Sequence, residues 1–426
     1  MKHLIIGNGP AGVVAAETLR QLDPAAEITL VGEEPGPPYS RMALPYYLMG
    51  HIGEQGTYLR KERAHFERLR IRLVHARAQS LDPPSRTVKC DDGTVLSYER
   101  LLLASGSHPL KPSLPGIDLP QVHTCWTLED ARRIARLAQP GARVLQLGAG
   151  FIGCILLEAL AGRGVQLTVV EMGERMVPRM MTPAAGAMIK RWCEHRGVRV
   201  HTGAQLEALA PSTEPGGALA ARLASGDTLI ADLVICAAGV RPNVGFLQGS
   251  GIAAAAGILV DEHMQTNLPG VYAAGDVTET TDFFSERRVL NAIQPNAADQ
   301  ARVAALNMAG KPARSQGALA INVLDTLGLI SSSFGQWWGE VGGESVERTD
   351  EQAYKYLSLQ FRHDVLIGAT AIGLTEHVGV LRGLIQTRTP LGKWKDTLLE
   401  DPTRIMEAYL ACAQRAELRY LGTRPI

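Results

Sequence analysis

Short apolar runs that each end at a glycine-rich turn recur along the first 315 residues. Leu4, Ile5 and Ile6 form one such run, a helical stretch follows over residues 13–22, and another apolar run covers residues 28–31. Short apolar runs between turns are typical of strands that are buried on both faces of a parallel sheet. The order strand, glycine turn, helix, strand therefore predicts an α/β domain.

The same order returns in the middle of the chain. Residues 143–147 predict a strand, residues 154–162 a helix and residues 166–170 a further strand. Prolines at positions 109, 112, 115 and 120 separate the two copies and indicate a linker and a change of domain. The other expected elements are strands at 71–75, 86–90, 101–103, 233–237 and 271–274, a turn at 91–93 and a helix at 295–309.

Residues 316–426 have a different pattern. Polar and apolar side chains alternate over residues 354–361, which predicts a strand, and residues 366–372 predict its partner. Helical patches follow near 376–388 and 402–415, so we expect a third unit of α+β type. Trp337 and Trp338 in this unit fit an interface and the cover of a core equally well.

Composition excludes several classes of protein. The chain has 43 acidic and 43 basic residues, so its zero formal net charge gives no reason to expect a nucleic acid or an anionic membrane as partner. No apolar run approaches the ~18 residues that span a bilayer. The first expected strand begins by residue 4, which leaves no room for a signal peptide, and we expect a cytoplasmic protein.

The six cysteines are scattered without a Cys-x-x-Cys pair, which favours isolated reduced thiols. Cys193 and His195 alone supply two of the four ligands that a structural metal needs, so we expect no metal site. No serine or cysteine has a histidine partner in a known catalytic spacing.

The first apolar run continues into Gly7-x-Gly9-Pro10-Ala11-Gly12, the spacing of a dinucleotide site. In such a site Gly7 permits a tight turn, Gly9 lets a pyrophosphate approach the backbone, and Gly12 lets the helix pack closely on the strand. The helix N-terminus offers free N–H groups and a partial positive charge to the phosphates. Glu33 ends the second strand, where a carboxylate can bind the adenosine ribose.

The second copy carries Gly148-x-Gly150-Phe151-Ile152-Gly153 and ends its second strand in Glu171. A carboxylate at this position accepts both ribose hydroxyls and would repel a 2′-phosphate, so it favours NAD(H) over NADP(H). Two copies of strand, glycine motif, helix, strand and acid are far more specific than one. The sequence therefore predicts that the chain binds two dinucleotides.

Three further segments supply candidate ligand contacts. Arg41 lies in a Pro- and Gly-rich loop over residues 34–50 that runs into a short apolar helix, and it could pair with a pyrophosphate or be a solvated surface arginine. Small residues follow a buried strand at Ala104-Ser105-Gly106 and would allow a ligand to approach the backbone. Asp276 follows Gly275 at the end of another buried strand, where its carboxylate could reach a polyol chain or simply close a turn.

Residues 1–315 resemble the flavoproteins of the glutathione-reductase type, the pyridine nucleotide–disulfide oxidoreductase superfamily. The resemblance is carried by Gly7–Gly12, Pro38-Tyr-Ser-Arg41, Ala104-Ser-Gly106, Gly148–Gly153, Gly239-Val-Arg-Pro-Asn243 and Thr266–Asp276. It implies that the first site holds FAD and the second NAD(P)H. It further implies that Asp276 contacts the FAD ribityl chain, Glu33 its ribose and Arg41 its pyrophosphate. Backbone contacts with the adenine or the ring are implied for Ala78, Asn296 and Ala297, and Gly239 and Gly275 are counted among the cofactor-binding residues.

The resemblance also implies the order of the domains. Residues 1–112 would be the first part of an FAD domain, 113–240 an inserted NAD domain, 241–315 the rest of the FAD domain, and 316–426 a C-terminal α+β interface domain. We therefore expect an α/β protein with two Rossmann-like domains and a C-terminal addition.

The chain departs from the superfamily where redox chemistry is concerned. The Cys-x-x-x-x-Cys of disulfide reductases is missing, and Met42 stands where coenzyme A disulfide reductases and NADH oxidases or peroxidases carry a cysteine. A methionine cannot form a thiolate. The lysine that many ferredoxin-type reductases have near Leu44-Pro45-Tyr46 is also absent, as is a glutamate at Ile155. In this respect the chain resembles rubredoxin reductases, the flavin part of nitrite reductases, and NAD-reducing flavin subunits of larger complexes.

These observations predict an FAD-dependent enzyme that exchanges hydride between NAD(H) and FAD. Without a redox cysteine, its electrons would pass singly to or from an external carrier or an iron–sulfur subunit, as in a 2-oxoacid dehydrogenase complex. Because the flavin carries the chemistry, no side chain is predicted to be catalytic. One alternative is an NADH enzyme that reduces thiols, peroxide or oxygen through Cys154 or Cys125, and another is a non-catalytic interaction protein with FAD as scaffold. Homo- and hetero-oligomers both stay open.

Overall fold

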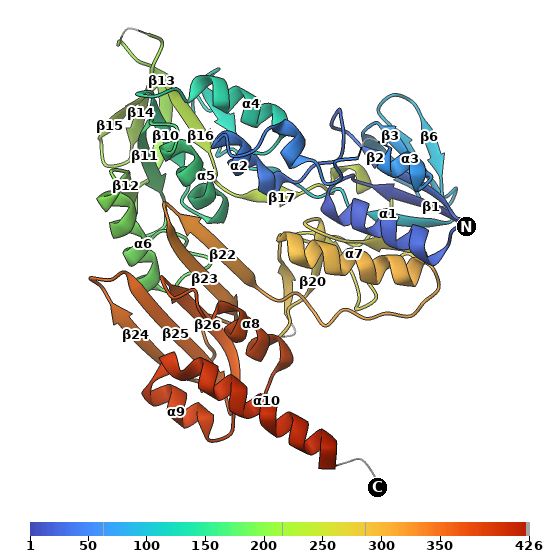
Figure 1. The fold of residues 1–426 in the computed structure, drawn as a ribbon. Helices are drawn as coiled ribbons and strands as arrows, with labels where there is room; N and C mark the ends of the chain where they lie inside the picture. The colour runs from blue at the N-terminus through green and yellow to red at the C-terminus, as the bar shows by residue number, and fades with distance from the viewer. Residues whose placement is uncertain (63, 215, 286, 423–426) are drawn as a thin grey trace. The chain divides into compact units, whose positions relative to one another are not determined.

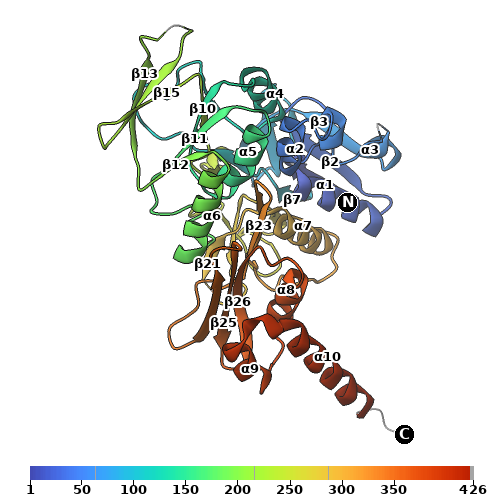
Figure 2. The ribbon, with the colours of Figure 1, turned by 60° about the vertical axis from the view of Figure 1, so that its left-hand side comes forward.

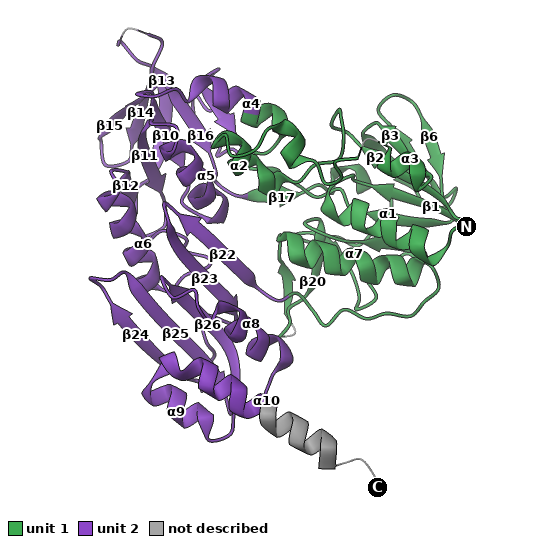
Figure 3. Ribbon diagram, viewed as in Figure 1, with its two compact units in different colours: residues 1–110, 126–131, 240–318 green, residues 111–125, 132–239, 319–426 purple. Residues whose placement is uncertain are grey.

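The structure is a computed structural model that describes residues 1–62, 64–214, 216–285 and 287–422, and the side chains of these residues as far as 413. The chain divides into two compact units (Figure 3). Unit 1 comprises residues 1–110, 126–131 and 240–318, and unit 2 comprises residues 111–125, 132–239 and 319–426. Within the described residues no helix is long and apolar enough to cross a membrane.

Unit 1 is built on a five-stranded parallel sheet in the order β19-β7-β1-β2-β3. Its strands are β1 (Lys2–Ile6), β2 (Glu27–Gly32), β3 (Ile71–His75), β7 (Arg100–Leu103) and β19 (Val271–Ala273). Helices α1 (Pro10–Leu22) and α7 (Gln294–Met308) lie side by side (Figures 1 and 2). The core between these elements is apolar and includes the fully buried Ile5, Leu30 and Leu102, as expected for strands covered on both faces.

Smaller elements complete unit 1. Strands β4 (Ala78–Asp82), β5 (Thr87–Cys90) and β6 (Val95–Ser97) form an antiparallel sheet, which contributes Leu81, Val88 and Leu96 to the same core. Strands β18 (Ile258–Leu259), β20 (Thr278–Thr281) and β21 (Arg288–Leu290) form another sheet, and β8 (Ser107–Pro109) pairs with β17 (Val240–Pro242). The short helices α2 (Leu44–Leu48) and α3 (His65–Arg68) precede β3.

Unit 2 contains a second five-stranded parallel sheet, in the order β12-β11-β10-β16-β9. Its strands are β9 (Val122–Thr124), β10 (Arg143–Leu147), β11 (Gln166–Glu171), β12 (Arg199–Thr202) and β16 (Leu233–Cys236). Helices α5 (Phe151–Ala161) and α6 (Pro183–His195) connect its strands, and α4 (Leu128–Leu137) precedes β10. A meander of β13 (Leu206–Pro211), β14 (Leu219–Leu223) and β15 (Thr228–Ala231) lies between β12 and β16 in the sequence.

The C-terminal part of unit 2 is an antiparallel sheet in the order β22-β23-β26-β25-β24. Its strands are β22 (Ile321–Thr326), β23 (Leu329–Gly335), β24 (Glu344–Asp350), β25 (Lys355–Arg362) and β26 (Val365–Ile372). Helices α8 (Val378–Thr387), α9 (Trp394–Glu400) and α10 (Ile405–Gly422) follow. Trp337 is buried, which fits the cover of a core, whereas Trp338 is 57% exposed.

The expected elements are present, with boundaries that shift by a few residues. Helix α5 begins three residues before the expected residue 154, because the glycine motif itself leads directly into the helix. Several elements were not predicted, among them helix α4 and strands β12, β13, β14, β15, β22, β23 and β24. Strand β24 is almost entirely exposed at the sheet edge, and such a strand has no alternation of buried and exposed positions to reveal it.

Candidate dinucleotide sites

The first glycine motif forms a tight turn between β1 and α1. Gly7 has a φ of +112°, and a Cβ atom there would lie 2.0 Å from the carbonyl oxygen of Ala104. A Cβ atom on Gly12 would lie 1.8 Å from the carbonyl oxygen of Gly7. Both contacts are with backbone, so neither position accepts a side chain. A Cβ atom on Gly9 would meet no atom within 4 Å, which leaves the space that a pyrophosphate needs.

The second motif repeats this geometry between β10 and α5. Gly148 has a φ of +100°, and its Cβ would lie 2.5 Å from the carbonyl oxygen of Ala237. The Cβ of Gly153 would lie 2.4 Å from the carbonyl oxygen of Gly148, whereas Gly150 has open space. The two turns also make equivalent backbone hydrogen bonds. The N–H of Gly7 donates to the carbonyl oxygen of Val31 on β2, and the N–H of Gly148 donates to that of Val170 on β11, each over 2.8 Å.

Each open glycine is the N-cap residue of its helix. Neither Gly9 before α1 nor Gly150 before α5 provides a side chain that caps the helix. The first N–H groups of each helix are therefore directed at the open space, and they favour an anion there. Pro10 and Ala11 form the first turn of α1, and Phe151 and Ile152 form that of α5. Both loops fit the pyrophosphate of a dinucleotide.

The two strand-end acids differ in their surroundings. Glu33 is 55% exposed, and its carboxylate lies 3.5 Å from Nε of Arg77. Glu171 accepts hydrogen bonds from the backbone N–H groups of Ala149 and Gly173, each at 2.7 Å. The second acid therefore also holds the glycine loop beside it, a role that its position in the sequence did not predict.

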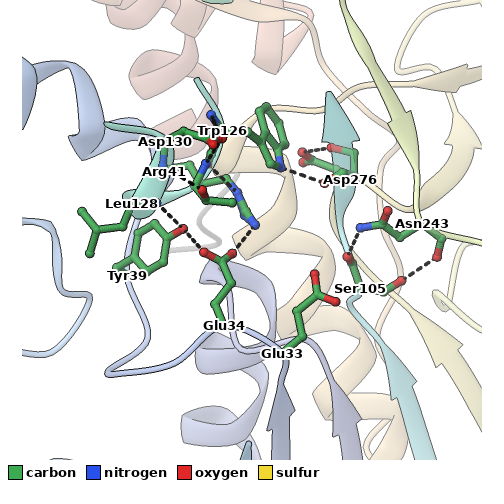
Figure 4. A network of polar contacts seen from close by, with 12 residues as sticks. Glu33, Glu34, Tyr39, Arg41, Ser105, Trp126, Leu128, Asp130, Asn243 and Asp276 are labelled. Carbon is green, nitrogen blue, oxygen red and sulfur yellow. Dashed lines mark hydrogen bonds and ion pairs between the residues drawn. The ribbon is translucent and has the colours of Figure 1, made fainter. Parts of the chain in front are cut away.

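Arg41 is held by a network within unit 1 (Figure 4). Its Nη2 lies 2.6 Å from Oε1 of Glu34, and its Nε donates to the carbonyl oxygen of Trp126 over 3.1 Å. The guanidinium carbon lies 5.1 Å from the centre of the Trp126 ring. The Tyr39 hydroxyl donates to the other oxygen of Glu34, and burial together with this carboxylate raises the pKa of Tyr39. The Arg41 side chain is 36% exposed and is held by these partners, and its pairing with a pyrophosphate stays a prediction.

Sequence reasoning missed Glu34, Tyr39 and Trp126 as members of this network. Glu34 and Tyr39 lie in the same loop as Arg41 and could have been considered as its partners. Trp126 is 85 positions away from Arg41, and no local signal connects the two.

Asp276 lies at the end of β19, after Gly275 with its φ of +84°. Its Oδ2 accepts a hydrogen bond of 3.0 Å from the Ser107 hydroxyl. Burial raises the pKa of the Asp276 carboxyl, although the Ser107 bond and the Arg41 charge act in the opposite direction. A partly buried carboxylate with an oxygen left to accept further bonds fits a ligand that carries several hydroxyl groups, as the ribityl chain of FAD does.

Several of the remaining candidates meet around the first glycine loop. A Cβ on Gly275 would lie 3.3 Å from Cβ of Ala11 and 3.6 Å from Cβ of Ala297, which joins β19 to the first turns of α1 and α7. Asn296 is also buried in that first turn of α7. The described chain therefore brings residues 7–12, 104–106, 275–276 and 296–297 together at the carboxyl ends of the strands.

The remaining candidate residues, Ser105, Gly239 and Ala78, lie in or next to the segments that connect strands. Ser105 and Asn243 bond to each other twice, at 3.0 and 2.8 Å, and the N–H of Asn243 donates to the Gly106 carbonyl oxygen. Gly239 has a φ of +116° shortly before this contact. Ala78 begins β4 soon after β3 ends.

All six cysteines lie among the described residues, where they are buried and form no disulfide bond. Burial raises the pKa of Cys154 well above its usual value, that of Cys193 to about 12 and that of Cys236 to about 11. Buried thiols with raised pKa values are poor nucleophiles. Met42, for which the family resemblance implies a cysteine in thiol-dependent enzymes, is 46% exposed. Within the described residues no three His, Cys, Asp or Glu side chains gather to hold a metal ion.

Two parallel sheets with equivalent glycine loops and strand-end acids define a protein that binds two dinucleotides. The chain belongs to the pyridine nucleotide-disulphide oxidoreductase family, whose model matches residues 1–305. The protein is therefore an NADH-dependent oxidoreductase with FAD and NAD(H) as its cofactors, within a family that passes electrons to ferredoxin- or rubredoxin-like carriers.

Three similar proteins are informative. The chain is 34% identical over 408 residues to the epsilon subunit of the NADH-dependent phenylglyoxylate dehydrogenase of Aromatoleum evansii, which is 95% of this chain and 96% of that subunit. A probable ferredoxin reductase of Castellaniella defragrans is 34% identical over 312 residues, 72% of this chain and 76% of that protein. The solved covalent complex of putidaredoxin reductase with putidaredoxin has a TM-score of 0.89 at 25% identity and covers 97% of this chain and 99% of that one.

Proposed function

We propose that this protein exchanges hydride between NAD(H) and FAD, and exchanges the electrons singly with an iron–sulfur or rubredoxin-like protein. The similarity to a ferredoxin reductase and to a reductase solved with its carrier supports such a partner. The similarity along almost the whole chain to a dehydrogenase epsilon subunit supports a finer proposal. In it, this chain is the NAD-reducing subunit of a complex that oxidises phenylglyoxylate or a related 2-oxoacid.

Each unit would bind one nucleotide. In unit 1 the open space at Gly9 and the N-terminus of α1 would bind the FAD pyrophosphate, with Arg41 nearby, and Asp276 and Glu33 would bind its ribityl and ribose hydroxyls. In unit 2 the space at Gly150 and the carboxylate of Glu171 would bind NAD(H). The bound flavin accepts or donates a hydride and can release electrons one at a time. The protein's own residues bind and orient the two nucleotides, and no side chain has to move a proton.

The burial of every cysteine is the observation that carries the choice of an external electron partner. A thiol-dependent reductase needs an accessible thiolate next to its flavin. Cys154, the first candidate for that role, is fully buried, and its thiol lies 3.6 Å from the Ala149 carbonyl oxygen. This environment favours the protonated, unreactive thiol.

The first experiment is anaerobic mixing of the FAD-loaded protein with NADH, followed by a one-electron acceptor such as ferricyanide. We expect NADH to bleach the flavin and the acceptor to restore its colour. The variants Cys154→Ser and Cys125→Ser should turn over at the rate of the unmodified protein. Loss of turnover in either variant would favour the thiol-dependent alternative, and a flavin that stays yellow with NADH would favour the non-catalytic scaffold.

A second experiment tests membership in a complex. The tagged chain is purified anaerobically from its native cells, and the proteins that accompany it are identified and assayed for iron and sulfide. We expect iron–sulfur subunits and NAD⁺ reduction that depends on an added 2-oxoacid. A chain that purifies alone would contradict the dehydrogenase proposal but not the electron-transfer proposal.

A further inference from the structure

A glutamine is buried in the middle of the second parallel sheet. Gln146 lies on β10 between Leu145 and Leu147, and it is paired with Val169 of β11 and Ile235 of β16. Its exposed fraction is 0%. Burial of an amide among apolar side chains costs free energy unless all its polar atoms are bonded, so its presence calls for a physical reason.

Only one end of this amide has a partner in the described part of the chain. Nε2 donates a hydrogen bond of 3.0 Å to the carbonyl oxygen of Gly148, whereas Oε1 is buried without a donor. The orientation of the amide follows from chemistry, since only its nitrogen can donate to a carbonyl. The Gln146 side chain therefore holds the first peptide of the glycine loop through Nε2, while its own Oε1 stays unpaired.

The chain contains its own comparison. Gly7 and Gly148 are equivalent positions of the two loops, so Ile5 of β1 is the equivalent of Gln146. Ile5 is also fully buried. An apolar side chain is therefore compatible with this turn, and the amide is a specific addition to the second loop.

Two neighbouring contacts add to this bond. Glu171 accepts from the N–H of Ala149, which is the other end of the same Gly148–Ala149 peptide. The N–H of Val177 donates over 2.8 Å to the Ala149 carbonyl oxygen, which belongs to the next peptide. Val177 makes this bond with a φ of +49°, a backbone conformation that β-branched residues rarely adopt. Two successive peptides of the loop are thus held by groups outside it.

We infer that Gln146 is a positioning residue for NAD(H), which keeps the Gly148 peptide oriented while the nucleotide is absent. The inference rests on the proposed assignment of the second loop to NAD(H). NAD(H) must enter and leave in every catalytic cycle, whereas FAD stays bound. A loop that is already ordered does not have to be ordered at each binding event, which strengthens binding.

The test is the variant Gln146→Met, which keeps the length of the side chain but removes the donor. It replaces one unpaired oxygen, Oε1, by another, the Gly148 carbonyl, so we expect Tm to change by no more than about 2 °C. Because a hydrogen bond of this kind contributes modestly to affinity, we expect about a fivefold rise in KM for NADH with kcat within about twofold. The Kd of NAD⁺, measured by calorimetry on the FAD-loaded protein, should rise by the same factor.

Ile5→Met is the matched control, because it places the same side chain at the equivalent position of the first loop. It should leave KM and Kd unchanged. An unchanged Kd in Gln146→Met, or an equal rise in both variants, would overturn the inference. If Gln146→Met does not fold, Gln146→Leu replaces it, and failure of both would assign Gln146 to folding of the sheet rather than to nucleotide binding. Absence of NADH binding by the unmodified protein would instead refute the proposed function.

Discussion

The variants Gly9→Ala and Gly150→Ala test the two proposed nucleotide sites one at a time. Neither position would place its Cβ within 4 Å of another atom, and the two φ angles of −73° and −74° suit any residue. The protein itself can therefore accept either methyl group. Alanine is a poorer N-cap residue than glycine, which costs up to about 1 kcal/mol and lowers Tm by at most about 4 °C.

The effect on the bound nucleotide should be much larger. The added methyl group occupies the space through which a pyrophosphate approaches the helix N-terminus. Loss of one charge-assisted hydrogen bond costs roughly 1.5–3 kcal/mol, which corresponds to about a ten- to hundredfold loss of affinity. We therefore expect Gly150→Ala to raise KM for NADH by about that factor and to keep its full flavin content. We expect Gly9→Ala to purify with less FAD, while the fraction that retains FAD keeps its KM for NADH.

The assay combines two measurements on each variant. Flavin content follows from the absorbance of FAD released by denaturation, and KM follows from anaerobic NADH oxidation with ferricyanide as acceptor. Gly383→Ala on α8 is the control, since a Cβ there also meets no atom within 4 Å. A KM in Gly150→Ala within twofold of the original would refute the argument from the open space. Loss of flavin in Gly150→Ala but not in Gly9→Ala would reverse the assignment of the two loops.

Three further predictions concern single side chains. Glu171→Ala should raise KM for NADH and lower that for NADPH, with about a tenfold change in their ratio, and an unchanged ratio would contradict contact with the ribose. Asp276→Ala should purify with less FAD than Ser107→Ala, because the serine supplies only one bond to the carboxylate; equal flavin content would contradict the role of Asp276. Burial lowers the pKa of His3 to about 4, below the 6.5 of the unfolded chain, so the unfolded state binds the proton first as the pH falls. Stability should therefore drop by up to about 3 kcal/mol between pH 6.5 and pH 4, and urea titrations of His3→Leu should lack this part of the decrease.

The glycine motifs could be predicted because their constraints are local. Gly12 and Gly153 each pack against the carbonyl oxygen of the glycine that opens the same turn, five positions earlier in the chain. A pattern over six residues therefore contains most of the geometry. The strand-end position of Glu171 is equally local, and the structure places Glu171 at the end of β11; its contact with the glycine loop was not predicted.

The surroundings of Arg41 could not be predicted in the same way. Its interaction with Trp126 depends on a return of the chain to unit 1 after a departure, which no local pattern encodes. Gln146 is an intermediate case. The sequence shows a polar residue inside an apolar run, and this interruption could have been noticed, but only the structure reveals which carbonyl it serves.

The amino-acid sequence by itself determined two glycine turns, the acid that follows each, and the lack of a cysteine at Met42. These features depend on sterics and chemistry within one strand–turn–helix unit or at one position. The tertiary structure decided which charges are neutralised, which thiols are buried, and which polar atoms lack partners. Those properties depend on segments far apart in the chain, since burial and pairing arise only when the elements of each unit pack together.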